Sequence, residues 1–129
     1  MKKEGFTLVE LLAVIVVLGL ILGLIIPKVM FTIANSKKDI YKSKENELIK
    51  VGEDYALYKN INMPTTMGET LEIPLVDIVN SKLINEIRDL DDNSLCTGKV
   101  TIIKTHTENY TYVPCIICTN YTTNNEYCN

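Results

Sequence analysis

The strongest constraint on the fold is an apolar run close to the amino terminus. From Phe6 to Ile26 the chain carries a single charged side chain, that of Glu10. As a helix rising about 1.5 Å per residue, this run reaches roughly 31 Å, the thickness of the hydrocarbon core of a bilayer. The run therefore predicts a membrane-spanning helix with one carboxylate near its start.

The same run differs from the apolar core of an ordinary secretory signal. It is longer than such a core, and the residues that follow it, from Ile25 to Met30, contain no small-residue cleavage site. We therefore expect it to remain on the mature protein. Lysines lie on both sides of the run, so the positive-inside rule does not decide its orientation.

The residues around the start of this run resemble a known processing signal. Lys2, Lys3, Glu4 and Gly5 are followed by Phe6-Thr7-Leu8-Val9-Glu10-Leu11-Leu12, which is similar to the signal of type IV prepilins and pseudopilins. The resemblance is specific over residues 2–27, extends along the helix to about Lys59 and is weak beyond it. It implies that a membrane-embedded prepilin peptidase cuts after Gly5 and methylates Phe6. It also implies assembly with other pilin subunits by a membrane machinery.

Glu10 calls for a physical explanation of its own. A carboxylate at the centre of a spanning helix costs about 2.5–3.5 kcal/mol, and less near an end, so such an acid usually has a partner or a function. After cleavage, the nearest cation is the new amino group of Phe6. The resemblance implies that Glu10 pairs with the Phe6 amine of a neighbouring subunit during assembly. The alternative is an acid at the headgroup level of a plain signal anchor.

Beyond Pro27 the apolar residues become periodic. Met30, Ile33, Tyr41, Leu48, Val51, Tyr55 and Tyr58 follow three-four spacing, with charged residues on the opposite side. We expect one helix from about Phe6 to Lys59. Pro27 removes a backbone hydrogen bond inside this helix, and Gly19 and Gly23 precede it, so we expect a kink or local melting over residues 19–27.

The remaining residues predict a small α+β head. We expect a loop from Met63 to Thr70, a short helix over Pro74–Ile87 and an antiparallel hairpin or small sheet. The two strands of the hairpin are 99–104 and 109–118. If residue 107 is the centre of the turn, Ile102 lies opposite Tyr112.

All four cysteines lie in the last third of the chain. A head of this size is marginally stable, and disulfides are a common remedy outside the cytoplasm. The hairpin register places Cys96 opposite Cys118 and leaves Cys115 to pair with Cys128, although four cysteines allow three pairings. The cysteines favour a cytoplasmic amino terminus and an extracytoplasmic head.

Other kinds of site fit the sequence less well. Cys115 and Cys118 have redox-motif spacing, but they lie in a β-branched run instead of at a helix start. The four cysteines lack the second close pair of a zinc site. The acids from Asp89 to Asp92 resemble the start of a calcium loop without its glycine and closing glutamate, so a surface turn is favoured. His106 is alone in a turn, and we expect no catalytic residue, metal or cofactor.

The charge balance also limits the partners. Residues 60–129 contain three lysines, one arginine and nine acids, a net charge of −5. Nucleic-acid binding requires Lys and Arg side chains that neutralise phosphates. We therefore expect no direct nucleic-acid partner.

The expected organisation has four parts. Residues 1–5 are a prepilin leader, 6–26 a transmembrane or filament-core helix, 27–59 its amphipathic continuation and 60–129 a disulfide-stabilised head. The resemblance implies a subunit of a type IV pilus or related filament, in membrane lipid before assembly and at the cell surface afterwards, with a role in adhesion or motility. Two alternatives stay open: a pseudopilin of a type II secretion or competence DNA-uptake system, and a membrane-anchored binding module that never polymerises.

Overall fold

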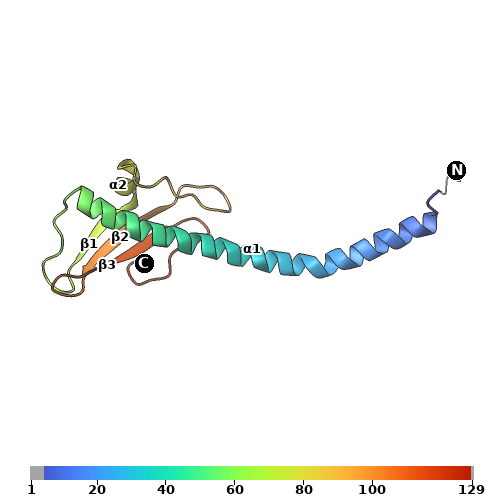
Figure 1. Ribbon diagram of the computed structural model, residues 1–129, viewed down its shortest axis with the longest axis horizontal. Coiled ribbons are helices and arrows are strands. Elements are labelled where there is room, and N and C mark those ends of the chain that lie inside the picture. The colour runs from blue at the N-terminus through green and yellow to red at the C-terminus, as the bar shows by residue number, and fades with distance from the viewer. Residues whose placement is uncertain (1–4, 129) are drawn as a thin grey trace. The chain divides into compact units, whose positions relative to one another are not determined.

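The protein combines one long helix with a small antiparallel sheet (Figure 1). The computed structural model describes residues 5–128. The elements are helix α1 (Leu8–Tyr58), strand β1 (Thr70–Pro74), helix α2 (Leu75–Asn80), strand β2 (Thr97–Lys104) and strand β3 (Tyr110–Ile117). This is the α+β, pilin-like layout that the sequence predicts. The chain divides into two units, residues 1–39 and residues 40–129.

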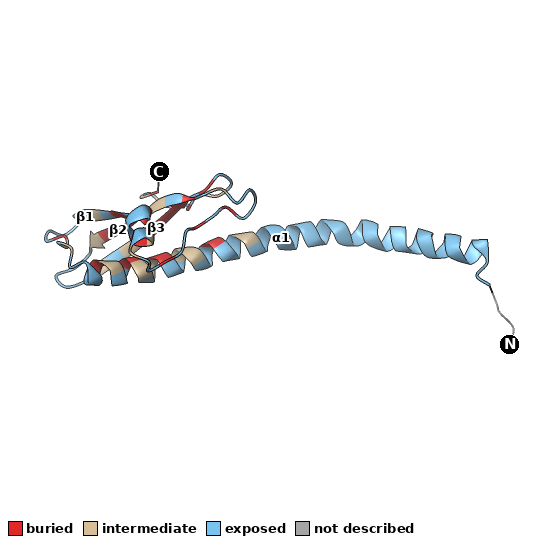
Figure 2. Cartoon of the chain, turned by 90° about the horizontal axis from the view of Figure 1, so that it is seen from above, coloured by how far each residue is buried: buried red, intermediate tan, exposed pale blue. Residues whose placement is uncertain are grey.

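In the first unit, α1 is helical from Leu8 onward and continues through Gly19, Gly23 and Pro27. Apart from the half-buried Lys37, its side chains are exposed along this part (Figure 2). Among the described residues, α1 is the one helix that is long and apolar enough to cross a membrane, judged by length and composition. A methyl group added at Gly19 or Gly23 meets no atom within 4 Å. The kink over residues 19–27 stays a prediction.

In the second unit, the three strands lie in the order β1-β2-β3 and both pairings are antiparallel. Ile102 is opposite Tyr112, which confirms the predicted register of the hairpin. Both faces of the central strand are covered, because consecutive residues Val100, Thr101 and Ile102 are all buried. The sheet therefore forms the middle of the head.

The part of α1 in the second unit buries a narrow stripe. Tyr41, Leu48, Gly52 and Ala56 are its buried residues. Of the predicted face, Tyr41 and Leu48 are buried and Val51 and Tyr55 pack against the core. Its other members differ, because Tyr58 is 73% exposed and Met30 and Ile33 in the first unit are exposed as well. The buried stripe also contains Gly52, where an added methyl group would lie 2.9 Å from a methyl carbon of Val100. Small residues bring the helix close to the sheet, and an apolar-residue count does not detect them.

The predicted helix over Pro74–Ile87 is wrong in its extent. Helix α2 ends at Asn80, and Lys82 has a φ of 62°, the left-handed conformation that commonly follows a helix. Ile84 and Ile87 are buried, but they lie in an irregular segment that follows the helix. The helical spacing predicted Leu83 and Ile87 on the buried face, but Leu83 is 39% exposed and Ile84 is buried instead.

Strand β1 is missing from the sequence expectation, which ended a loop at Thr70 and began a helix at Pro74. Its five residues pair with β2, from Thr70 opposite Ile103 to Pro74 opposite Lys99. Only Ile73 is buried in it. A strand this short on the sheet edge presents too few alternating apolar positions to be recognised.

Two disulfides close the head. Cys96 is bonded to Cys118 and Cys115 to Cys128, the pairs expected from the hairpin register. The first lies at the open end of the hairpin. The second holds the carboxyl-terminal segment beside β3, where the N–H of Thr123 donates to the Ile116 carbonyl and Asn125 Nδ2 donates to the Pro114 carbonyl.

Candidate functional site

Glu10 lies in the first turn of α1 and is joined to Thr7 by two reciprocal hydrogen bonds. The Thr7 N–H donates to Glu10 Oε2 over 3.1 Å, and the Glu10 N–H donates to Thr7 Oγ1 over 3.3 Å. This arrangement is a capping box, which satisfies two N–H groups that have no partner inside the helix. Sequence reasoning missed it, although a threonine followed by a glutamate three residues later is its known signature.

The capping box gives Glu10 a role in its own helix. The positive end of the helix dipole also favours a carboxylate at this position. An ionised carboxylate has about four lone-pair sites, and Thr7 occupies one, so Glu10 retains sites for further donors. Glu10 is exposed and open to such a donor.

The residues of the predicted cleavage point lie just before the helix. Gly5 and Phe6 have no regular secondary structure, and Phe6 is 87% exposed. Together with Thr7 and Glu10 they line an open hollow. Residues 1–4 of the predicted leader lie outside the described residues.

The sequence comparison addresses this same segment. The prokaryotic N-terminal methylation motif matches residues 1–26 of the chain. The chain carries a type IV prepilin-like signal. No curated protein and no solved structure matches the chain. The matched motif, which is confined to residues 1–26, supports a type IV pilin-like or pseudopilin protein.

The prepilin-like signal has consequences for partners and location. It implies processing by a prepilin peptidase and assembly with other pilins. The apolar helix that carries it fits a membrane-anchored pilin. Proteins with this motif have structural functions instead of enzymatic ones.

In the head, Glu45 of α1 holds the carboxyl-terminal segment. Its Oε1 accepts hydrogen bonds from the Tyr121 hydroxyl over 2.5 Å and from the Thr123 hydroxyl over 2.7 Å. The Tyr121 ring stacks on that of Tyr41, with centroids 3.9 Å apart. Burial raises the pKa of Tyr121 to about 12, and the hydrogen bond to Glu45 and its charge act in the same direction. The hydroxyl therefore remains a donor at neutral pH.

Asp89 organises the neighbouring loops. Only 2% of it is exposed. It accepts the N–H groups of Asp91 over 2.7 Å and Asn120 over 2.7 Å, and a further bond from Asn120 Nδ2 over 3.3 Å. Burial acts to raise the pKa of Asp89, but these hydrogen bonds outweigh it and hold the pKa below its usual value. Next to it, the Leu90 N–H donates to the Tyr41 hydroxyl over 3.0 Å.

The carboxylates of this loop thus serve the loop itself. Asp92 accepts the N–H of Ser94 over 2.9 Å in addition to the Ser94 hydroxyl. Among the described residues, no group of three or more His, Cys, Asp or Glu side chains is placed to hold a metal ion. The hydrogen bonds are those of a turn, the structure that the sequence favours over a calcium loop.

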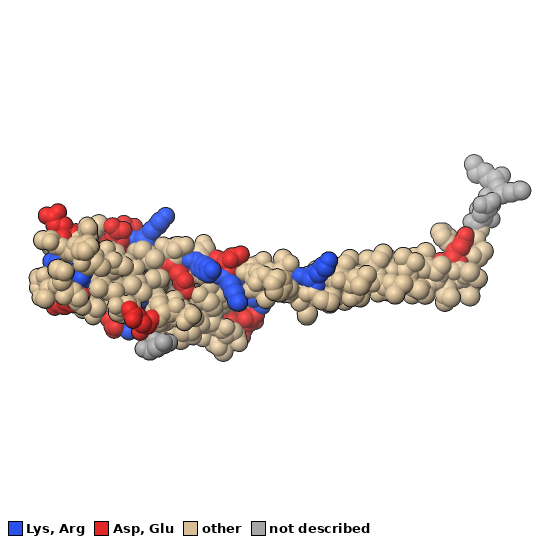
Figure 3. All heavy atoms as spheres, turned by 90° about the horizontal axis from the view of Figure 1, so that it is seen from below, with Lys and Arg blue, Asp and Glu red and all other residues tan. Residues whose placement is uncertain are grey.

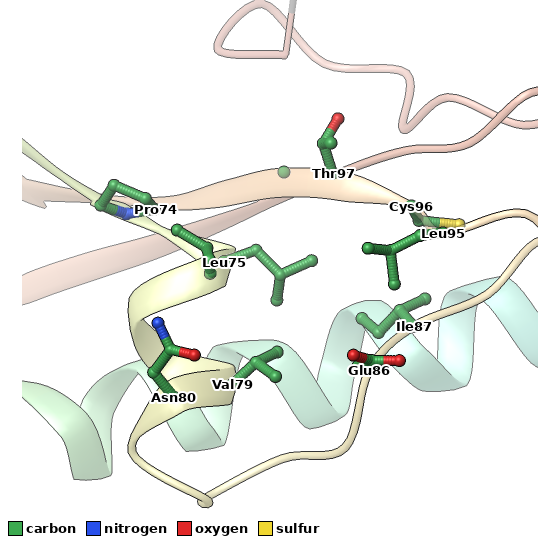
Figure 4. A pocket seen from close by; sticks show the side chains of 11 residues that line it. Pro74, Leu75, Val79, Asn80, Glu86, Ile87, Leu95, Cys96 and Thr97 are labelled. Atoms are coloured by element: carbon green, nitrogen blue, oxygen red, sulfur yellow. The ribbon is translucent and has the colours of Figure 1, made fainter.

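The head also has a cavity of about 290 Å³ beside α2. Leu75, Val79, Ile87 and Leu95 contribute its apolar side chains, and Figure 4 shows them directed into the same space. Its polar side chains are Asn80, Glu86 and Thr97. The lining contains one titratable group, Glu86, and therefore no acid–base pair for general catalysis.

The remaining candidate residues are separated from one another. Cys115 and Cys118 belong to different disulfides, so they do not form a dithiol pair. His106 is exposed in the turn between β2 and β3. The backbone N–H of His106 donates to the Asn109 carbonyl, and this bond closes the turn.

Proposed function

We propose that this protein is a structural subunit of a type IV pilus or a related filament. It is cut after Gly5, methylated on Phe6 and held in the membrane by residues 6–26, with its amino terminus in the cytoplasm and its head outside. The observation that carries the proposal is the prepilin-like signal running directly into an uninterrupted apolar helix. Its partners are the prepilin peptidase, other pilin subunits, the assembly machinery and, before assembly, membrane lipid.

The exposed apolar side chains of α1 explain why such a subunit polymerises. Outside the membrane these side chains have to be buried again, because burying apolar surface is favourable by roughly 25 cal/mol per Å². Equivalent helices of other copies provide that cover. A head-to-tail contact that does not close into a ring produces a helical polymer.

Glu10 positions each copy against its neighbour in this assembly. Its carboxylate pairs with the Phe6 amine of a neighbouring copy, because an isolated charge in an apolar bundle is strongly unfavourable. A bend at Pro27, with Gly19 and Gly23 before it, would adjust the helix to its neighbours without breaking it.

The decisive experiment is the substitution Glu10→Gln, which removes the charge and keeps a residue that also forms capping boxes. We expect normal cleavage after Gly5 and a loss of filaments by about tenfold or more, since an unpaired amine costs more than 1.4 kcal/mol. Filament yield is measured by shearing and immunoblotting, normalised to processed protein. Glu47→Gln, an exposed acid on the same helix, is the matched control. Wild-type yields from Glu10→Gln would contradict the proposal.

A pseudopilin of a secretion or DNA-uptake system shares the signal and the helix. A deletion strain separates the roles: loss of adhesion or motility supports the pilus, whereas loss of protein export or transformation supports the pseudopilin. A binding module that never polymerises predicts normal surface display and function for Glu10→Ala.

A further inference from the structure

The apolar part of α1 contains two charges instead of one. After Pro27 and Lys28, the run continues with Val29, Met30, Phe31 and Ile33, all exposed. From Phe6 to Ile33 the charged side chains are therefore Glu10 and Lys28. On the face that Figure 3 shows, this part of the helix is otherwise uncharged.

The spacing of these two charges places them on one face of the helix. They are separated by 18 residues, and α1 is unbroken between them. At 3.6 residues per turn this separation is about five full turns, with a rise of roughly 27 Å. Within one helix they are too far apart to interact directly.

Neither charge is neutralised inside the chain. Among the described residues, Glu10 is bonded through its carboxylate to Thr7 alone, and the Lys28 ammonium takes part in no ion pair. In the membrane both are tolerated, because a span over residues 6–26 leaves Glu10 near one interface and Lys28 at the other. In a helix bundle away from lipid headgroups, each needs a counter-charge.

We propose that Glu10 of one copy pairs with Lys28 of a second copy that is displaced by about 27 Å along the helix axis. The proposal rests on the proposed function, and charge complementarity identifies the second copy as the occupant of this helix face. Unshifted parallel copies would oppose acid to acid. The displacement brings acid to base and places the start of one apolar run beside the stretch from Leu24 to Ile33 of the next.

This contact is compatible with the Phe6 amine as a partner. Phe6 is only four positions before Glu10 in the chain, so that contact joins copies with a much smaller displacement, and a helix in a bundle has several neighbours. The carboxylate has lone-pair sites for both donors. Moving one copy outward by about the length of its span brings its Glu10 level with Lys28 of a copy still in the membrane.

Cysteine cross-linking tests the displacement in assembled filaments. One tagged copy carries Leu11→Cys and one untagged copy carries Val29→Cys, each next to a charged residue. Because the native cysteines are all in disulfides, a bis-maleimide reagent joins only the introduced thiols. We expect the 11–29 heterodimer to be the main product. Leu11→Cys with Leu20→Cys is the control, since nine residues correspond to half the displacement and the opposite face.

The outcomes separate the two proposals. If filaments form but their 11–20 cross-links equal or exceed their 11–29 cross-links, the proposed displacement is wrong. The proposed function as a filament subunit is then unaffected. The absence of filaments from the wild-type chain, together with the absence of cross-linked oligomers from the cysteine variants, would overturn both.

Charge substitutions provide a second, independent measurement. Lys28→Glu should reduce filament yield, relative to protein processed at Gly5, by about tenfold or more, because acids then oppose each other. Lys28→Arg should retain assembly. Lys42→Glu makes the same charge change at an exposed position beyond the apolar run and should assemble normally. Wild-type yields from Lys28→Glu would overturn the pairing.

Discussion

At the scale of single residues, two buried threonines of the head differ in whether the fold gives them a partner. Thr123 Oγ1 donates to Glu45 and accepts the N–H of Ile116 over 3.0 Å. Thr101 Oγ1 is buried in the sheet and has no hydrogen-bond partner among the described residues. A buried hydroxyl without a partner lowers stability, whereas a bonded one maintains it.

The substitution Thr101→Val should therefore raise the free energy of unfolding by about 1 kcal/mol, because it keeps the shape and removes the unsatisfied group. Thr123→Val is the matched control and should lower it by about 1–3 kcal/mol, since it leaves the Ile116 N–H without an acceptor. Chemical denaturation of the full chain in detergent measures both. A loss of stability in Thr101→Val would show that the hydroxyl has a partner.

Asp89 should make the stability of the head depend on pH on the acid side. Its pKa is lower in the folded state than in the unfolded chain, so its contribution is complete above the unfolded value of about 3.9 and is lost as pH falls through the folded value. Asp89→Asn should be less stable than the wild type at pH 7, because an amide nitrogen would face the Asn120 N–H. The difference should shrink steadily below pH 4 in thermal melts. A difference independent of pH would contradict the shift.

At the scale of elements, the contact between α1 and the sheet depends on Gly52. Its missing side chain lets Val100 approach, and an added methyl group would lie 2.9, 3.1 and 3.3 Å from three carbons of that valine. A distance below 3.0 Å requires a shift of the valine or of the helix. The position is thus a spacing residue between two elements.

Gly52→Ala should lower the free energy of unfolding by about 1–3 kcal/mol through overpacking. Gly19→Ala, on the same helix with open space around it, should cause no such loss, since alanine is the better helix former. The double substitution Gly52→Ala with Val100→Ala should lose less stability than the sum of the two single substitutions, because the smaller side chain leaves room for the added methyl group. Denaturation midpoints give the comparison, and additive losses in the double variant would contradict a direct contact.

Elements with a strong local sequence pattern were predicted correctly, and elements without one were missed. The long helix was predictable because α1 has a long periodic sequence. The hairpin was predictable because taking residue 107 as the centre of the turn pairs Ile102 with Tyr112. Strand β1 and the end of α2 were not, because their backbone is decided by pairing with β2 and by a left-handed Lys82. Neither feature has a local signature.

The candidate site divides in the same way. Gly5, Phe6 and Glu10 form a short linear motif and were recognised from the sequence. The cluster around Glu45 joins residues far apart in the chain, such as Tyr121 and Thr123. A single sequence carries no signal for such contacts.

At the scale of the whole molecule, mass spectrometry of the mature protein tests processing and cross-linking together. We expect a chain that begins at methylated Phe6 and weighs four hydrogens less than the reduced form, two for each disulfide. Reduction should restore those hydrogens and open all four cysteines to alkylation. Retention of residues 1–5 or alkylation without reduction would contradict the expectation.

The anchoring of Tyr41 and Glu45 has a mechanical consequence. Tyr41 is the first buried residue of α1, so tension transmitted along the helix enters the head near its stacked ring and the adjacent carboxylate. The segment that they grip, with Tyr121 and Thr123, lies between Cys118 and Cys128, whose bonds lead back to Cys96 and Cys115. A load on the helix is thus passed to this segment by ring stacking and hydrogen bonds and from there to the strands by the two disulfides, so a reducing agent should make the head unfold at a lower force.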